Sequence, residues 1–113
     1  MAALRDSRDR LTKVLDSRHT TRGGLIRLEA WMNSHTKQVV KYNLAYVNHH
    51  FPRDNGRLLG FDNDHLYPGF TTLHHCHWHG RVYEDQKFVS FTKTLDRFQR
   101  HLMRLKRTLG RNY

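Results

Sequence analysis

The sequence contains a single cysteine, few acidic residues and no long apolar run. Cys76 cannot form an internal disulfide, as is typical of proteins from a reducing compartment. No segment approaches the ~20 apolar residues of a transmembrane helix, so we expect no membrane partner. The N-terminal stretch MAALRDSRDR is charged from Arg5 onward and lacks the apolar region of a secretory signal. These absences together predict a cytoplasmic protein.

Acidic residues are outnumbered two to one, since 10 Asp and Glu stand against 20 Lys and Arg. The net charge is +10 with histidine neutral, and residues 92–113 carry seven basic residues and one acidic residue. Such a surface is typical of proteins that bind nucleic acid or another polyanion. The alternative interpretation is a solvated basic surface with no partner.

Hydrophobic periodicity predicts an α+β fold in a single domain of residues 1–113. Leucines on one face predict an N-terminal helix over residues 4–17. Alternating apolar residues predict a hairpin over 25–32 and 39–47, a short strand over 57–63 and an extended segment over 74–84. A long C-terminal helix is predicted by apolar residues spaced 3, 4, 3 and 4, with Ser90 or Thr92 as its cap: Leu95, Phe98, Leu102, Leu105 and Leu109. We expect this helix to pack on an antiparallel sheet of about four or five strands.

The C-terminal helix carries a second stripe, made of four arginines spaced 3, 4 and 3: Arg97, Arg100, Arg104 and Arg107. Planar guanidinium groups match phosphate oxygens well, so the stripe predicts an RNA-binding face. A solvated helix face normally carries acidic residues among its basic ones. Acidic residues are scarce around this stripe.

The segment Leu73–Glu84, LHHCHWHGRVYE, holds four histidines within six residues. Side chains alternate along a strand, so one face is predicted to carry His75, His77, His79 and Arg81. The other face, with Cys76, Trp78 and Val82, is predicted to point into the core. Gly80 is a candidate for a bulge that would shift the strand register at Arg81.

Three interpretations of the histidines remain open. Imidazoles can supply the base and the acid of RNA cleavage near neutral pH, with Arg81 beside the phosphate and Asp62 and His65 shaping the site. Alternatively, His75, His77 and His79 can bind zinc or another divalent metal, with Asp62, Asp64 or His65 completing the set. No metal is favoured, because the sequence contains no established zinc motif. The third interpretation is a polar strand with hydrogen-bonded histidines.

The order of these segments resembles the TumE family of toxin–antitoxin proteins. The resemblance rests on VKYNLAYV, RDNGRLLGFDNDH, HHCHWHGRVYEDQKFVSF and LDRFQRHL, and it covers about residues 25–105. The matching positions are the histidine strand and Gly60, Phe61, Asp62, Asn63 and His65. The resemblance implies a type II toxin, ribonuclease-like or otherwise directed at translation, and a cognate antitoxin that often has a helix-turn-helix.

The first hypothesis is therefore a cytoplasmic ribonuclease toxin whose acid–base groups are His75, His77 and His79. RNA and an antitoxin with an acidic segment are its expected partners, and a homo-oligomer or a toxin–antitoxin hetero-oligomer is compatible with the sequence. The second hypothesis is a non-catalytic nucleic-acid-binding module with a histidine-bound metal. A toxin that modifies or blocks a protein or tRNA is the third, although no glycine loop for nucleotide binding is present.

Overall fold

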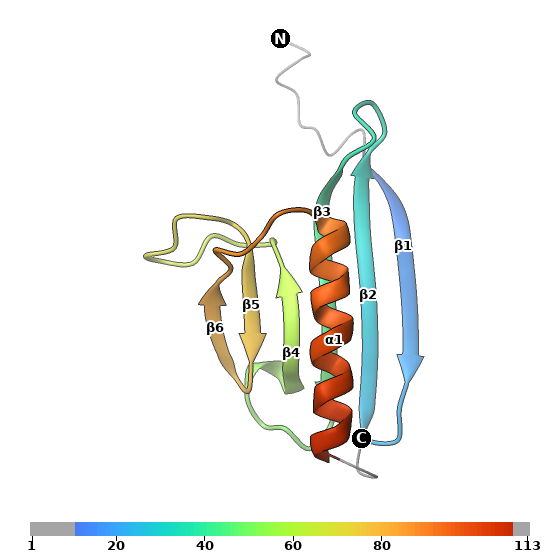
Figure 1. Cartoon of the computed structure of the whole chain (residues 1–113), viewed down its shortest axis with the longest axis vertical. Helices are drawn as coiled ribbons and strands as arrows, with labels where there is room; N and C mark the ends of the chain where they lie inside the picture. The colour runs from blue at the N-terminus through green and yellow to red at the C-terminus, as the bar shows by residue number, and fades with distance from the viewer. Residues whose placement is uncertain (1–10, 110–113) are drawn as a thin grey trace.

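The computed structural model describes residues 11–109. Within this range six strands form one antiparallel sheet in the order β1-β2-β3-β4-β5-β6, and α1 lies along one face of it (Figure 1). Their bounds are β1 Leu11–Thr20, β2 Gly24–Asn33, β3 Val39–Asn48, β4 Arg57–Asp62, β5 His75–Trp78, β6 Arg81–Glu84 and α1 Phe91–Leu109. Each strand pairs with its neighbour in sequence. No helix among these residues is long and apolar enough to cross a membrane.

The structure confirms the predicted hairpin, the predicted short strand and the C-terminal helix. β2 and β3 pair along their whole length, with Leu28 opposite Leu44. Gly24 allows the close approach of the two strands, since a Cβ atom there would overlap the carbonyl oxygen of Val47. Asn63 closes the end of β4, because its side chain accepts the backbone N–H of Tyr42 at 3.0 Å.

The predicted N-terminal helix is wrong for residues 11–17, which belong to β1, and residues 4–10 lie outside the described part. β1 pairs with β2 in antiparallel register, with a bulge between Lys13 and Leu15. The leucines of this segment form only a thin apolar stripe, which stabilises a helix weakly. Backbone hydrogen bonds to the edge of the β2–β3 hairpin stabilise a strand more. Lys13 also pairs with Glu29 of β2 at 2.8 Å.

The predicted strand over 74–84 is two strands, which brings the sheet to six instead of four or five. His79 and Gly80 form the two-residue turn between β5 and β6, with φ of 49° and 86°. Positive φ at both central residues is the geometry of the tightest β-hairpins. Gly80 therefore reverses the chain and does not introduce a bulge. Val82 consequently lies opposite His77, on the face away from Cys76 and Trp78.

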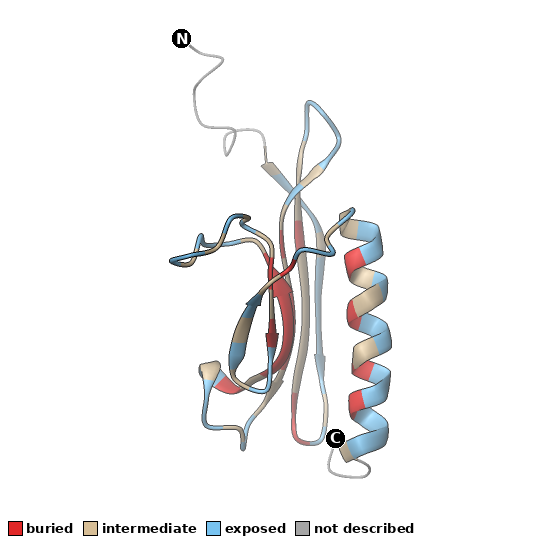
Figure 2. Ribbon diagram, turned by 60° about the vertical axis from the view of Figure 1, so that its left-hand side comes forward, coloured by how far each residue is buried: buried red, intermediate tan, exposed pale blue. Residues whose placement is uncertain are grey.

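The core lies between α1 and the sheet. The predicted apolar stripe of α1 packs on β3 and β4, with Phe98, Leu102 and Leu105 buried (Figure 2). Phe98 meets Phe61 of β4 edge to face, at 6.4 Å between ring centroids. Ser90 caps the helix, since its Oγ accepts the backbone N–H of Lys93 at 3.2 Å.

Truncation of the helix anchor tests this packing. Phe98 is completely buried, so Phe98→Ala should lower the free energy of unfolding by about 3–5 kcal/mol through lost contacts and a cavity. Met103→Ala is the matched control, because Met103 on the same helix is exposed and should cost no more than about 0.5 kcal/mol. Urea denaturation followed by circular dichroism measures both. Equal losses in the two variants would contradict this account of the core.

Candidate functional site

The pairing of β4 with β5 distributes the candidate residues over two faces of the sheet. Asp62 pairs with His75 and Gly60 with His77, and these positions face away from α1. Phe61 pairs with Cys76 and Leu59 with Trp78, and these positions face α1. Two sites follow, one on each face. We call Asp62, His75 and His77 the buried triad. The cavity between α1 and the β4–β6 strands is the helix groove.

The buried triad is tightly connected. Exposed fractions are 4% for Asp62, 0% for His75 and 1% for His77. Nε2 of His77 lies 3.1 Å from Oδ2 of Asp62. Nε2 of His75 lies against Oδ1 of Asp62. Both imidazoles therefore turn the same ring nitrogen toward one carboxylate.

The other ring nitrogen of each histidine is held by a separate partner. Nδ1 of His75 is 2.9 Å from the carbonyl oxygen of Leu73. Nδ1 of His77 is 2.8 Å from Oδ2 of Asp54. The two rings are thus oriented by groups outside the triad, as is usual for histidines whose second nitrogen has a defined task.

Arg57 is the cation next to the triad. Its Nη1 donates to Oδ2 of Asp62 at 2.9 Å and lies 3.1 Å from Nε2 of His77. Burial raises the pKa of Asp62, but the contacts with His75 and His77 outweigh burial and bring the pKa below its usual range. Asp62 is therefore a carboxylate at neutral pH.

Local sequence makes this arrangement possible at two points. A turn of three positive-φ residues, Asp54 to Gly56, places the Asp54 carboxylate under His77. Gly60 leaves room for Arg57, since a Cβ atom at position 60 would lie 2.7 Å from its Cδ. The turn Asp54-Asn55-Gly56 thus reverses the chain and also positions a carboxylate that orients His77.

A polar cavity of about 260 Å³ lies beside the triad. Asp62 and Arg57 reach it from the triad side, whereas neither His75 nor His77 lines it. His65 is at its rim, and 66% of its side chain is exposed. The Tyr67 ring covers His75, with 4.8 Å between the ring centroids.

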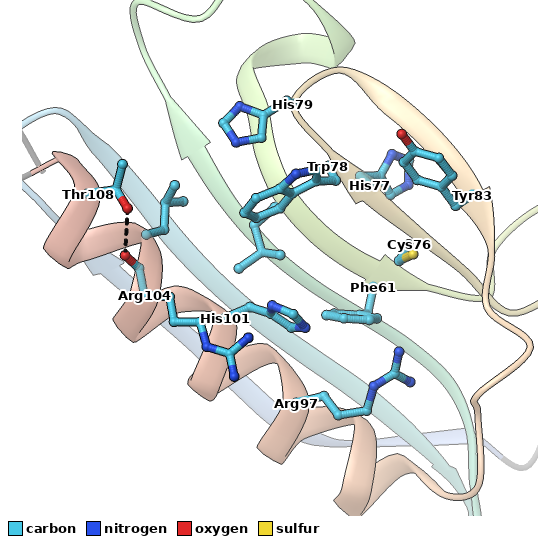
Figure 3. Close-up of a pocket in the computed structure, with 12 residues that line it drawn as sticks. Phe61, Cys76, His77, Trp78, His79, Tyr83, Arg97, His101, Arg104 and Thr108 are labelled. Atoms are coloured by element: carbon cyan, nitrogen blue, oxygen red, sulfur yellow. Dashed lines mark hydrogen bonds between the residues drawn. The ribbon is translucent and has the colours of Figure 1, made fainter.

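The helix groove has a different character. Its volume is about 510 Å³, and its sheet wall contains Phe61, Trp78 and Tyr83. Trp78 and Tyr83 are 38% and 44% exposed, so both rings offer apolar surface to a bound molecule. Figure 3 shows Trp78 pointing into the cavity between His79 and His101. The predicted burial of Trp78 in the core is therefore wrong.

The opposite wall of the groove is basic. Arg97, His101 and Arg104 line it, and the same three residues line an adjoining cavity of about 380 Å³ together with Lys87 and Arg100. Burial, followed by the charges of Arg104, Arg97, Arg100 and Lys87, lowers the pKa of His101. The imidazole of His101 is accordingly neutral at pH 7, in a strongly positive potential.

The four predicted RNA-binding arginines differ in their surroundings. Arg97 pairs with buried Asp85 at 2.9 Å and lies over the Phe61 ring. Arg100 pairs with exposed Asp96 at 3.1 Å. Arg104 and Arg107 have no ion pair with any acidic residue in the described range. Arg97 therefore helps to fix the wall, and Arg104 has the unpaired charge inside the groove.

The structure brings together only part of the predicted site. Asp62, His75 and His77 meet in the triad, whereas His79 lies in the turn and lines the groove. Arg81 is exposed and pairs with Trp78 across the hairpin. Sequence reasoning missed Asp54, Arg57 and His101. His101 was detectable, because it lies between the predicted arginines on the helix. Comparison with family models, curated proteins and solved structures found no match.

Removing the triad carboxylate should destabilise the fold. Asp62→Ala leaves Arg57 and two buried imidazoles without their common partner, which should cost about 3–5 kcal/mol. Asp64→Ala is the control, because 51% of the Asp64 side chain is exposed and its pair with Lys41 is at the surface; it should cost less than about 1 kcal/mol. Chemical denaturation of both variants provides the measurement. A loss for Asp62→Ala no larger than for Asp64→Ala would show that the network adds nothing to folding.

Proposed function

We propose that the protein is an RNA-directed toxin that holds single-stranded RNA in the helix groove and cleaves it by histidine acid–base chemistry. The toxin class and the cognate antitoxin come from the TumE resemblance. The observation that supports RNA as the target is the groove, in which exposed aromatic rings face a basic helix. The proposed place of action is the cytoplasm.

The groove offers both kinds of contact that single-stranded RNA uses. Unstacked bases can lie on the exposed ring faces of Trp78 and Tyr83, and stacking of this type contributes about 1–3 kcal/mol per base. The phosphates can then lie along Arg104 on the facing wall and along Arg100 and Lys87 of the adjoining cavity. A double helix keeps its bases stacked on each other, so the groove favours single strands.

Acid–base cleavage requires one general base and one general acid near the same phosphate, and two imidazoles can fill these roles. In the proposed reaction His101 takes the proton of the ribose 2′-hydroxyl, and the 2′-oxygen forms a bond to phosphorus. The bond from phosphorus to the 5′-oxygen then breaks, and this oxygen takes a proton from His79. A 2′,3′-cyclic phosphate and a 5′-hydroxyl are the products, and Arg104 offsets the charge that develops on the phosphate.

The roles assigned here differ from the initial hypothesis. His75 and His77 have both ring nitrogens directed at protein groups and are closed to RNA. His75 does not line the helix groove, whereas His77 borders it but directs its ring nitrogens at Asp54 and Asp62. His79 and His101, by contrast, line the same cavity as Arg104, on either side of Trp78 (Figure 3). This is why the acid–base pair is placed there.

A cognate antitoxin would act by covering the basic wall. An acidic segment that lies on Lys87, Arg100 and Arg104 would compete directly with RNA phosphates for the same cations. The second candidate function is a nucleic-acid-binding module without catalysis. It is supported by the same aromatic and basic walls, since neither needs chemistry to bind a strand.

Replacing the two groove histidines distinguishes cleavage from binding. His101→Gln and His79→Ala should each slow cleavage of a labelled single-stranded RNA about 10²–10⁴-fold, because each removes one proton transfer. RNA affinity, measured by fluorescence anisotropy, should change little. The same variants should relieve growth arrest when the protein is expressed in a bacterial host.

His65→Ala is the control, because His65 is exposed at the other face of the sheet. It should cleave RNA at the wild-type rate. Undiminished cleavage in the doubly substituted His79 and His101 protein would refute the assignment. RNA binding with no cleavage by the wild-type protein would instead establish the binding module.

The pH dependence of cleavage reports on His101. The base must be neutral to accept a proton, and the positive surroundings lower the pKa of His101. The acidic limb of the kcat/KM profile should therefore lie below pH ~6.5, the ordinary histidine value. Activity should persist as the pH falls to that limb and then decline. A limb at or above the ordinary value, or one that His101→Gln leaves unchanged, would exclude His101 as the base.

A further inference from the structure

We propose that Asp62, His75 and His77 bind one divalent transition-metal ion at the face of the sheet opposite the helix groove. The potential ligand atoms of these three residues all lie within 4.8 Å of one another, and all three residues are buried. The proposal does not depend on the RNA function, because it rests on the contacts among these three residues, although His77 also borders the helix groove.

The hydrogen-bond partners of the two rings fix the positions of the ring protons. A backbone carbonyl and a carboxylate can only accept hydrogen bonds, so the Leu73 carbonyl and Asp54 each require an N–H at the Nδ1 that faces them. A neutral imidazole carries one ring proton. The Nε2 atoms of His75 and His77 therefore carry lone pairs in the neutral form, which is the state of a metal ligand.

The lone pairs on both Nε2 atoms face the carboxylate oxygens of Asp62. Nε2 of His75 lies against Oδ1 of Asp62, and Nε2 of His77 lies 3.1 Å from Oδ2. Lone pairs on nitrogen and on a carboxylate oxygen repel each other, so a positive centre has to lie between them. Arg57 provides one for His77. Among the described residues no cationic side chain is recorded beside the buried Nε2 of His75, which lies against Oδ1 of Asp62.

The donor atoms of the triad indicate which kind of ion it would bind. Two imidazole nitrogens and one carboxylate suit zinc and the other late first-row divalent ions, whereas Ca²⁺ and Mg²⁺ prefer oxygen ligands. Cys76 is excluded as a ligand, because it lies on the face toward α1. Of the metal set that the sequence suggested, His75, His77 and Asp62 meet, whereas His79 lies in the turn after β5.

Asp54, which contacts the ring of His77, also belongs to the proposed metal site although it is not a ligand. Asp54 is a positioning residue, because its carboxylate fixes the ring of His77 through Nδ1 without reaching the proposed ion. Such partners typically contribute 10–100-fold to metal affinity. Asp54→Asn keeps the shape and tolerates the φ of 50° at this position.

The test uses the full chain after removal of metal by a chelator. Co²⁺ is titrated in first, because its visible absorption reports nitrogen and oxygen coordination, and Zn²⁺ is then added as a competitor. We expect one tight site per chain and a higher melting temperature with either ion. His77→Gln and Asp62→Asn should lose at least about 100-fold in affinity, and Asp54→Asn about 10–100-fold.

A variant with His49→Gln and His50→Gln is the matched control, because these adjacent histidines are exposed and far from the triad in sequence. It should retain the tight site. The proposal is overturned if affinity falls in this variant and not in the triad variants, or if no tight site exists.

Ring-nitrogen NMR of the wild-type protein serves if the triad variants do not fold. Zn²⁺ should shift the Nε2 resonances of His75 and His77. Protons on both nitrogens of each ring in the presence of excess Zn²⁺ would mean that the positive centre is a pair of imidazolium groups, and would refute the metal. RNA cleavage that continues after a chelator has removed the metal would show that the groove function does not need the metal site. The metal proposal and the RNA proposal can therefore fail separately.

Discussion

The backbone pairing of β4 with β5 determines both candidate sites. Asp62 stands opposite His75, and the alternation of side chains then assigns every neighbour to one face or the other. Aromatic residues reach the helix groove, and the two imidazoles with their carboxylate reach the far face. A shift of one residue in this pairing would exchange the two sets, so the register carries the chemical organisation of the molecule.

The two sites use histidine in opposite ways. His75 and His77 are enclosed, each with a fixed orientation and both ring nitrogens facing protein groups. His79 and His101 line an open cavity, next to aromatic rings and arginines. Enclosed imidazoles with fixed tautomers suit coordination, whereas accessible ones suit proton transfer to a bound molecule. A histidine-rich motif can thus serve two purposes once the chain folds.

Regular periodicity made much of the fold predictable from the sequence. The stripe of Phe98, Leu102 and Leu105 defined α1 and its buried face, and the alternation in residues 25–32 and 39–47 defined the central hairpin. The first strand was not predictable in this way, since β1 has few buried residues and depends on pairing with β2. Pairing of that kind is a tertiary effect that local spacing does not encode.

The site was predictable only where it depends on strand alternation. The shared face of His75 and His77 follows from their spacing, but the turn at His79 breaks the pattern because positive φ is accessible there. Asp54 and Arg57 enter the triad from a separate turn, and His101 enters the groove from the helix. Contacts between segments so distant in sequence have no local signal.

The outer edge of β1 bears on how copies of this chain interact with one another. β1 pairs with β2 on one side only among the described strands, which leaves a row of backbone groups open to another chain. Lys13, Asp16 and Arg18 place charges along this ten-residue edge. These charged side chains disfavour the pairing of two such edges, because the charges would have to give up their water on contact.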